Sequence, residues 1–268
     1  MHEERMTFGW VLAGIPMPAF ARIGIRLLSA VVWILICYAL SWGGGRAWRK
    51  RMSRAWVHGL RAIIGLQVFW RGTPPGKPYF LVTNHLTWQD FFALVCTCDA
   101  TIVVQAADDT IPLVGRLMAG LGVIPAPCPG GDASRCVEQM VSALQKGESL
   151  VMAPEGIVGP GREVRIFHPE LLEAAVRTMT PVHYLSFTYR TPAGYPPPSQ
   201  AVLFGPDPMF RTPDGRIPES ELAAWGPERP FFPHLLGVLS LPRHEIIVRF
   251  GDAPITGENA DTLAADLQ

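Results

Sequence analysis

The sequence has few charged side chains and no net charge. Charged residues make up 17% of the 268 positions, with 23 Lys and Arg against 23 Asp and Glu, while hydrophobic residues make up 49%. The charged share lies well below the roughly 25% of an average soluble domain. This composition excludes a disordered chain, and it argues against a nucleic-acid partner bound through bulk charge.

The sequence also lacks cysteine pairs and a serine-nucleophile motif. Its five cysteines are odd in number and form no C-x-x-C pair, and no G-x-S-x-G motif occurs. In a cytoplasmic domain, such cysteines are expected to be reduced, buried thiols rather than disulfides or metal ligands. We therefore predict no metal site, and we expect any reacting hydroxyl to come from a substrate.

The zero net charge conceals a basic N-terminal part and an acidic remainder. Residues 1–80 hold 11 basic and 2 acidic side chains, a formal charge of +9, so the rest of the chain carries −9. This asymmetry indicates that the N-terminal part contacts an anionic partner such as a lipid surface.

An uncharged stretch of 19 residues runs from Leu27 to Gly45. As a helix it would reach about 28 Å, close to the roughly 30 Å hydrocarbon core of a bilayer. Basic residues crowd positions 46–54 after it, which marks a cytoplasmic flank. We predict a segment that contacts lipid, either spanning the membrane or dipping into it. A buried core helix is the alternative, and a cleavable signal peptide is disfavoured because no cleavage site follows.

Residues 46–64 alternate arginine with apolar side chains. This pattern predicts a basic amphipathic helix on anionic lipid, with an ordinary solvated helix as the alternative. We therefore divide the chain into a membrane anchor with its basic amphipathic helix, residues 1–64, and a second domain, residues 65–268. The basic flank predicts a membrane location with the second domain on the cytoplasmic face.

Beyond Gly65, short β-rich runs alternate with helical patterns between glycine and proline residues. The alternation predicts an α/β fold with a mostly parallel central sheet flanked by helices. The expected strands are 66–70, 79–83, 101–105, 123–125, 149–153, 182–189, 201–204 and 245–250, and the expected helices are 88–97, 113–121, 133–145 and 169–179. The proline-rich residues 190–233 are expected to be irregular. In such sheets, ligands bind beyond the carboxyl ends of the strands.

The expected strand 79–83 leads into Asn84, His85 and, five residues after the histidine, Asp90. With Thr87 as a helix N-cap, Asp90 falls in the first helical turn, within reach of the imidazole. An aspartate there would fix the tautomer and leave the other ring nitrogen to take a proton from a hydroxyl. The alternatives are a plain capping box between Thr87 and Asp90 and a histidine that bonds only to backbone.

A glycine-rich loop follows the expected strand 149–153. It begins Pro154-Glu155-Gly156 and continues to Arg162 and Arg165. Exposed backbone N–H groups in such a loop can hold an anion, with these two arginines as charge partners. A surface turn is the alternative.

Together these motifs resemble the glycerolipid acyltransferases, the family of lysophosphatidic acid acyltransferase. Asn84, His85 and Asp90 look like its N-H-x-x-x-x-D signature, and Pro154-Glu155-Gly156 looks like its P-E-G-T block. Residues 111–115 with 122–124, and 180–182 before an apolar strand, are similar to its other two blocks. The run 161–174 resembles a branch that includes bacterial acyltransferases of ornithine lipids, with Phe167 and His168 where that branch has Phe-Lys.

The resemblance implies direct transfer of an acyl group from acyl-CoA or acyl-carrier protein to the hydroxyl of a lysolipid, with no cofactor or metal. It implies that His85 is the general base and Asp90 its orienting partner. The expected substrate-binding residues are Asn84, Glu155, Gly156, Arg162, Phe167 and His168. The expected partners are membrane lipid, the lysolipid acceptor and the acyl carrier. The resemblance also implies that residues 65–268 form the catalytic domain, on the cytoplasmic face of a bacterial inner membrane.

The sequence departs from the family pattern at the residues after Glu155-Gly156. The family has Thr-Arg there and assigns the arginine to the acceptor's phosphate, whereas this chain has Ile157 and Val158. Losing an arginine removes a charge-assisted pair. The primary prediction is a 1-acyl-glycerol-3-phosphate type enzyme of phospholipid biosynthesis. The alternatives are an acyltransferase of lyso-ornithine lipid or another phosphate-free acceptor, a non-catalytic lipid-binding or acyl-CoA-binding protein, and a thioesterase.

Overall fold

The protein is built on one sheet. The structure is a computed structural model that describes residues 4–5, 17–105, 112–127, 131–156, 158, 164, 166–203 and 231–268. Its strands are β1 (Glu4–Arg5), β2 (Leu66–Arg71), β3 (Phe80–Thr83), β4 (Thr101–Gln105), β5 (Ile124–Ala126), β6 (Leu150–Met152), β7 (Val182–Arg190) and β8 (His244–Phe250). In the described residues they form a single sheet in the order β1-β2-β8-β7-β3-β6-β4-β5.

Most neighbouring strands run parallel. The antiparallel pairs among the described strands are β1–β2 and β7–β8, and the other five pairs are parallel. This arrangement confirms the predicted α/β class with a mostly parallel sheet flanked by helices. The sequence pattern had not shown that β2 and β8 run opposite to the rest.

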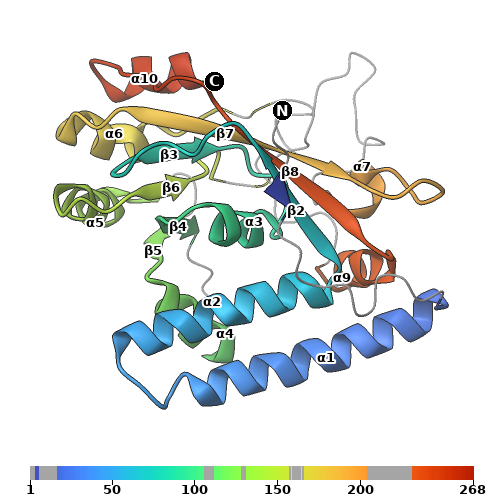
Figure 1. Cartoon of the computed structure of the whole chain (residues 1–268). Coiled ribbons are helices and arrows are strands. Elements are labelled where there is room, and N and C mark those ends of the chain that lie inside the picture. The colour runs from blue at the N-terminus through green and yellow to red at the C-terminus, as the bar shows by residue number, and fades with distance from the viewer. Residues whose placement is uncertain are drawn as a thin grey trace.

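Helices cover both faces of the sheet (Figure 1). The helices are α1 (Ala19–Leu40), α2 (Arg46–Ile63), α3 (Asp90–Thr97), α4 (Pro112–Leu121), α5 (Ser134–Gln145), α6 (Pro169–Thr178), α7 (Pro198–Ala201), α9 (Phe231–Ser240) and α10 (Ala260–Leu267). Helices α5, α6 and α10 share one core with the sheet, and α1, α2, α3, α4 and α9 share the other.

Alternation along the strands divides the side chains between these two cores. On β3, Leu81 belongs to the core of α2 and α3, whereas Phe80 and Val82 belong to the core of α5 and α6. Successive side chains of a strand point to opposite faces, so a strand buried on both faces is apolar throughout. This is why the run at 79–83 lacks polar alternation.

Helix α1 begins earlier than the uncharged stretch that predicted it and ends before Gly43. It has a mean hydropathy of 2.2, with 11% of its apolar window buried, and is long enough to cross a membrane. It includes Arg22 and Arg26, whose guanidinium groups donate to backbone carbonyls. Arg22 donates to the carbonyls of Met17 and Ser240, and Arg26 to carbonyls at the end of α9 and just after it. Arg26 donates to the carbonyls of Leu241 and Pro242 at 2.6 and 2.9 Å.

Helices α1 and α2 lie side by side below the sheet (Figure 1). Trp33 of α1 donates from Nε1 to the carbonyl of Trp56 on α2 at 3.2 Å. A side chain at Gly59 would clash with the Trp33 ring, so glycine permits this close approach. Trp56 lies in the same core as β2 and α3. The domain boundary after residue 64 stays a prediction.

Two expectations about the C-terminal part were wrong. Residue 201 ends the short helix α7, so the strand expected at 201–204 does not begin there; residue 204 lies outside the described residues. Helix α9 begins within the stretch that was expected to be irregular, with Pro233 tolerated in its first turn. Helix α10 was not predicted, although Asn259 caps it by accepting from Thr262 N at 2.9 Å.

The cysteines within the described residues are free thiols. Cys98 and Cys136 are buried, and burial raises the pKa of each thiol to about 11. A high pKa keeps a thiol protonated and unreactive. Cys128 lies outside the described residues.

Candidate active site

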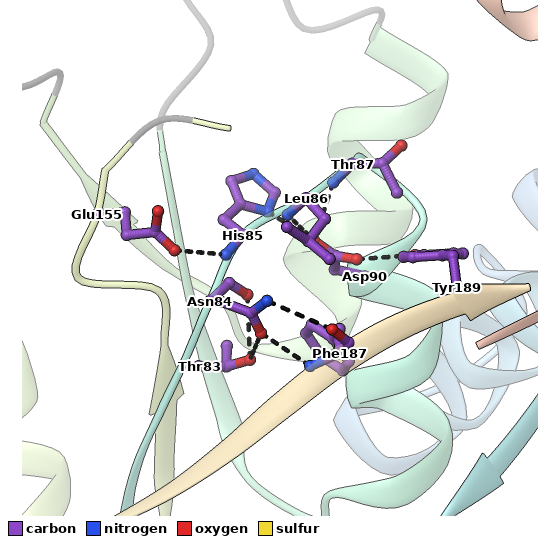
Figure 2. Close-up of polar contacts among 9 residues, drawn as sticks. All are labelled: Thr83, Asn84, His85, Leu86, Thr87, Asp90, Glu155, Phe187 and Tyr189. Carbon is purple, nitrogen blue, oxygen red and sulfur yellow. Dashed lines mark hydrogen bonds and ion pairs between the residues drawn. The ribbon is translucent and has the colours of Figure 1, made fainter. Parts of the chain in front are cut away.

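The two predicted loops lie side by side because their strands are neighbours. β3 pairs in parallel with β6, with Val82 opposite Met152. The chain leaves β3 toward His85 and leaves β6 toward Glu155 at the same edge of the sheet, as expected for a parallel pair. Figure 2 shows His85 between Glu155 on one side and Asp90 on the other.

His85 and Asp90 form a hydrogen-bonded pair. Nδ1 of His85 lies 2.9 Å from Oδ2 of Asp90. The aspartate side chain is 3% exposed and the histidine side chain 31% exposed. With Asp90 as acceptor, Nδ1 carries the proton and Nε2 becomes a proton acceptor. No hydrogen bond to Nε2 occurs within the described residues, so this atom is free to meet a substrate.

The loop between the two residues wraps around the aspartate. Oδ2 of Asp90 accepts from the backbone N–H of Leu86 at 2.6 Å and of Thr87 at 3.0 Å. The predicted N-cap role of Thr87 is wrong: α3 begins at Asp90, the cap position falls on Gln89, and the Thr87 hydroxyl has no partner. The Asp90 carboxylate therefore holds both the backbone of this loop and the ring of His85.

Tyr189 on β7 completes the surroundings of Asp90. Its hydroxyl donates to Oδ1 of Asp90 at 2.7 Å. Burial, and then the nearby Asp90 charge, raise the pKa of Tyr189 well above its usual value, so the hydroxyl keeps its proton. Sequence reasoning missed this residue. The alternating burial of Leu185, Phe187 and Tyr189 places it on the α3 face, but only the sheet order brings it to Asp90.

The side chain of Asn84 continues the sheet where β3 ends. Its Oδ1 accepts from Phe187 N at 2.8 Å and its Nδ2 donates to Phe187 O at 3.4 Å. The Asn84 amide thus forms hydrogen bonds with both the backbone N–H and the backbone C=O of Phe187 (Figure 2). Asn84 was predicted to bind substrate; the structure places its amide against β7, where it fixes the start of the loop that carries His85.

Glu155 lies next to His85, on the side away from Asp90 (Figure 2). Its carboxylate is buried, and Oε1 accepts from His85 N at 2.8 Å. Gly156, predicted beside it in the acceptor pocket, has φ of +69°, a left-handed conformation that favours glycine. The structure therefore brings the side chain of Glu155 to the backbone N–H of His85.

The other predicted site residues lie further along the chain. His168 precedes α6, and its backbone N–H donates to Pro154 O at 2.9 Å, which ties it to the loop of Glu155. Phe167 is buried in the core of α5 and α6. This position does not support the role in substrate binding that was expected for it. Arg162 and Arg165 lie outside the described residues.

Two buried histidines flank the turn between His85 and Asp90, and sequence reasoning missed both. Trp88 donates from Nε1 to Nδ1 of His234 at 3.1 Å. Gln89 is hydrogen-bonded through Oε1 to Nε2 of His244 at the start of β8. These long-range contacts hold residues 88 and 89 and so support the turn before Asp90. Within the described ranges, no cluster of three His, Cys, Asp or Glu side chains could hold a metal.

Comparison with known proteins identifies the domain that contains this site. The family model described as Acyltransferase matches residues 67–188, which include the His85–Asp90 pair, Glu155 and Tyr184 of β7. The match covers less than half of the chain, and over these residues the chain is similar to the acyltransferase family. The matched residues extend from β2 almost to the end of β7.

Two known proteins are similar to this chain over much of its length. A lyso-ornithine lipid O-acyltransferase from Pseudomonas aeruginosa is 26% identical over 182 residues, 68% of this chain and 70% of that protein. The crystal structure of the 1-acyl-sn-glycerophosphate acyltransferase from Thermotoga maritima matches with a TM-score of 0.57 and 14% identity. It covers 93% of this chain and 92% of that one, and it shows a shared fold.

Proposed function

We propose that this acyltransferase moves an acyl chain from a thioester to the hydroxyl of a lysolipid, with His85 as general base. The observation that carries the proposal is the 2.9 Å contact between His85 Nδ1 and Asp90 Oδ2, which leaves a partly exposed Nε2 as a proton acceptor. The thioester belongs to acyl-CoA or to acyl-carrier protein, so the reaction needs no further cofactor.

In this geometry the acyl group passes directly from the thioester to the acceptor hydroxyl. Nε2 accepts the proton of the acceptor hydroxyl while the hydroxyl oxygen attacks the thioester carbonyl. The C–O bond forms, the C–S bond breaks, and the proton passes from the imidazolium to the departing thiolate. Asp90 stabilises the imidazolium in between and keeps its ring oriented. The side chain of Glu155 holds the histidine backbone in place.

The acceptor has two candidate chemistries. The fold shared with a 1-acyl-sn-glycerophosphate enzyme supports a phosphate-bearing lysolipid. The sequence relative that acts on lyso-ornithine lipid, and Val158 where the family places an arginine, support an acceptor without phosphate. An apolar side chain offers no charge-assisted bond to a phosphate.

We infer that α1 binds the membrane along its length, on the cytoplasmic face of a bacterial inner membrane. One side of α1 packs on α2, and its other side exposes apolar side chains such as Leu28, which is 67% exposed. The exposed Arg46, Arg49 and Lys50 begin α2, beside the last turns of α1. Sinking this end of α1 into hydrocarbon would desolvate those charges, whereas a surface position places them among anionic headgroups.

The test is acyl transfer by the purified full-length protein in lipid vesicles. Acyl-CoA and acyl-carrier protein are supplied in turn with lysophosphatidic acid or lyso-ornithine lipid, and both free thiol and acylated lipid are measured. His85→Ala should abolish transfer while vesicle binding is retained, and the partly buried His183→Gln on β7 serves as the matched control. Thiol release without an acceptor would indicate a thioesterase. No release with any pair would indicate a binding protein.

A further inference from the structure

The hydrogen bonds to Asp90 are divided between its two oxygens. Oδ2 receives three N–H donors, from His85, Leu86 and Thr87. Oδ1 receives the hydroxyl of Tyr189 at 2.7 Å. The tyrosine reaches this oxygen from β7, on the opposite side of the carboxylate from the catalytic loop (Figure 2).

The placement of these donors on different oxygens favours one orientation of the Asp90 carboxylate. The carboxylate of an aspartate can turn about its last torsion, and the two oxygens are chemically alike. With a donor fixed on a sheet strand at one oxygen and three on the loop at the other, a rotated carboxylate would lose several bonds. Tyr189 is buried and keeps its proton, so it acts only as a donor toward Asp90.

We propose that Tyr189 is a positioning residue of the acyl transfer: its hydroxyl fixes the Asp90 carboxylate toward His85 and offsets part of the carboxylate's charge. The proposal rests on the proposed role of the His85–Asp90 pair. The ionisable groups that hydrogen-bond to the pair within the described residues are Glu155, from the loop after β6, and Tyr189 itself. Both the orientation of His85 and the charge beside its ring therefore depend on a residue of β7.

A purely structural role for Tyr189 predicts a different experimental result from a positioning role. A buried hydroxyl needs an acceptor whatever its function, so its removal lowers stability in either case. A structural role leaves the pH profile of the reaction unchanged. A positioning role changes it, because removal of the O–H leaves more negative charge on Asp90 and favours the protonated imidazole.

The experiment compares Tyr189→Phe with Tyr184→Phe, a more exposed tyrosine on the same strand. For Tyr189→Phe we expect kcat to fall about tenfold with KM within about twofold, since one charge-assisted bond orients the base. We also expect the acidic limb of the kcat/KM profile to move about half a pH unit higher. The Tyr184→Phe variant should match the wild type. An unchanged acidic limb in Tyr189→Phe would overturn the proposal.

A second measurement separates this proposal from the proposed function. In protein labelled with ¹⁵N-histidine, the Nδ1–H proton bonded to Asp90 should resonate at a different position in Tyr189→Phe, and not in Tyr184→Phe. The His85→Gln variant assigns the signal. This readout needs no turnover, so an inactive wild type contradicts the acyl transfer alone, whereas an unmoved His85 signal contradicts the role of Tyr189.

Discussion

The buried carboxylate of Glu155 accepts a hydrogen bond from the backbone N–H of His85 at 2.8 Å, so a residue expected to touch substrate contacts the proposed general base. Because β3 and β6 are neighbours in parallel register, the two loops meet at the same edge of the sheet. His85 is therefore held from two sides, through its backbone by Glu155 and through its ring by Asp90.

The contact between Glu155 and His85 predicts different outcomes for two substitutions. Glu155→Gln keeps an oxygen that can accept the His85 N–H, so activity should fall only a few-fold. Glu155→Ala leaves a partly buried N–H without this acceptor, which costs up to about 1–3 kcal/mol. Urea unfolding and initial rates measure both. A Gln variant that is fully stable yet inactive would instead assign the carboxylate to the substrate.

The pairing of His85 with Asp90 predicts a large loss on neutralising the carboxylate. In Asp90→Asn the side chain no longer stabilises the imidazolium, and it can present an N–H where His85 needs an acceptor. We expect kcat to fall by about 10²–10⁴-fold, as for aspartates in comparable roles. Steady-state rates check this, with circular dichroism to confirm the fold. A loss below about tenfold would contradict the assigned role.

The buried His244 predicts a pH-dependent stability. Its pKa is lowered from 6.5 to about 3 by burial first, and then by the charges of Arg26 and His234. Between these values the unfolded chain binds a proton that the folded chain does not, so stability falls as pH drops from about 6.5 toward 3. The slope for one proton is about 1.4 kcal/mol per pH unit.

The variant His244→Gln isolates this contribution. It should be less stable than the wild type at pH 7.5, because the buried contact with Gln89 is altered. Its free energy of unfolding should nevertheless change less between pH 7 and pH 5. Urea unfolding at several pH values measures both slopes. Parallel slopes would show that His244 does not bind the extra proton on unfolding.

The exposed side of α1 predicts a loss of membrane binding when it is charged. Leu28 and Leu35, 67% and 50% exposed, lie seven residues apart on the helix. Each leucine buried in lipid contributes about 1.5–3 kcal/mol, so a Leu28→Lys, Leu35→Lys variant should bind vesicles at least about a hundredfold more weakly. Vesicle sedimentation measures this. The control is Met179→Lys, at an exposed residue after α6 on the other face of the sheet.

The local part of the site was predictable from the sequence. His85 and Asp90 are five residues apart across a single strand-to-helix turn, so few backbone paths connect them. The alternation of short apolar runs with amphipathic helices likewise determined the α/β class, because each pattern matches one backbone period. The uncharged stretch from Leu27 indicated α1, although its first residues went unrecognised because they include arginines.

The remaining contacts depend on strand order, which no local pattern encodes. Tyr189 reaches Asp90 across 99 residues because β7 lies beside β3, and Glu155 reaches His85 across 70 residues because β6 lies on the other side. The sequence by itself placed a histidine and an aspartate within reach of each other. Only the tertiary structure decided which side chains hold that pair in place, because those contacts arise when distant strands pack into one sheet.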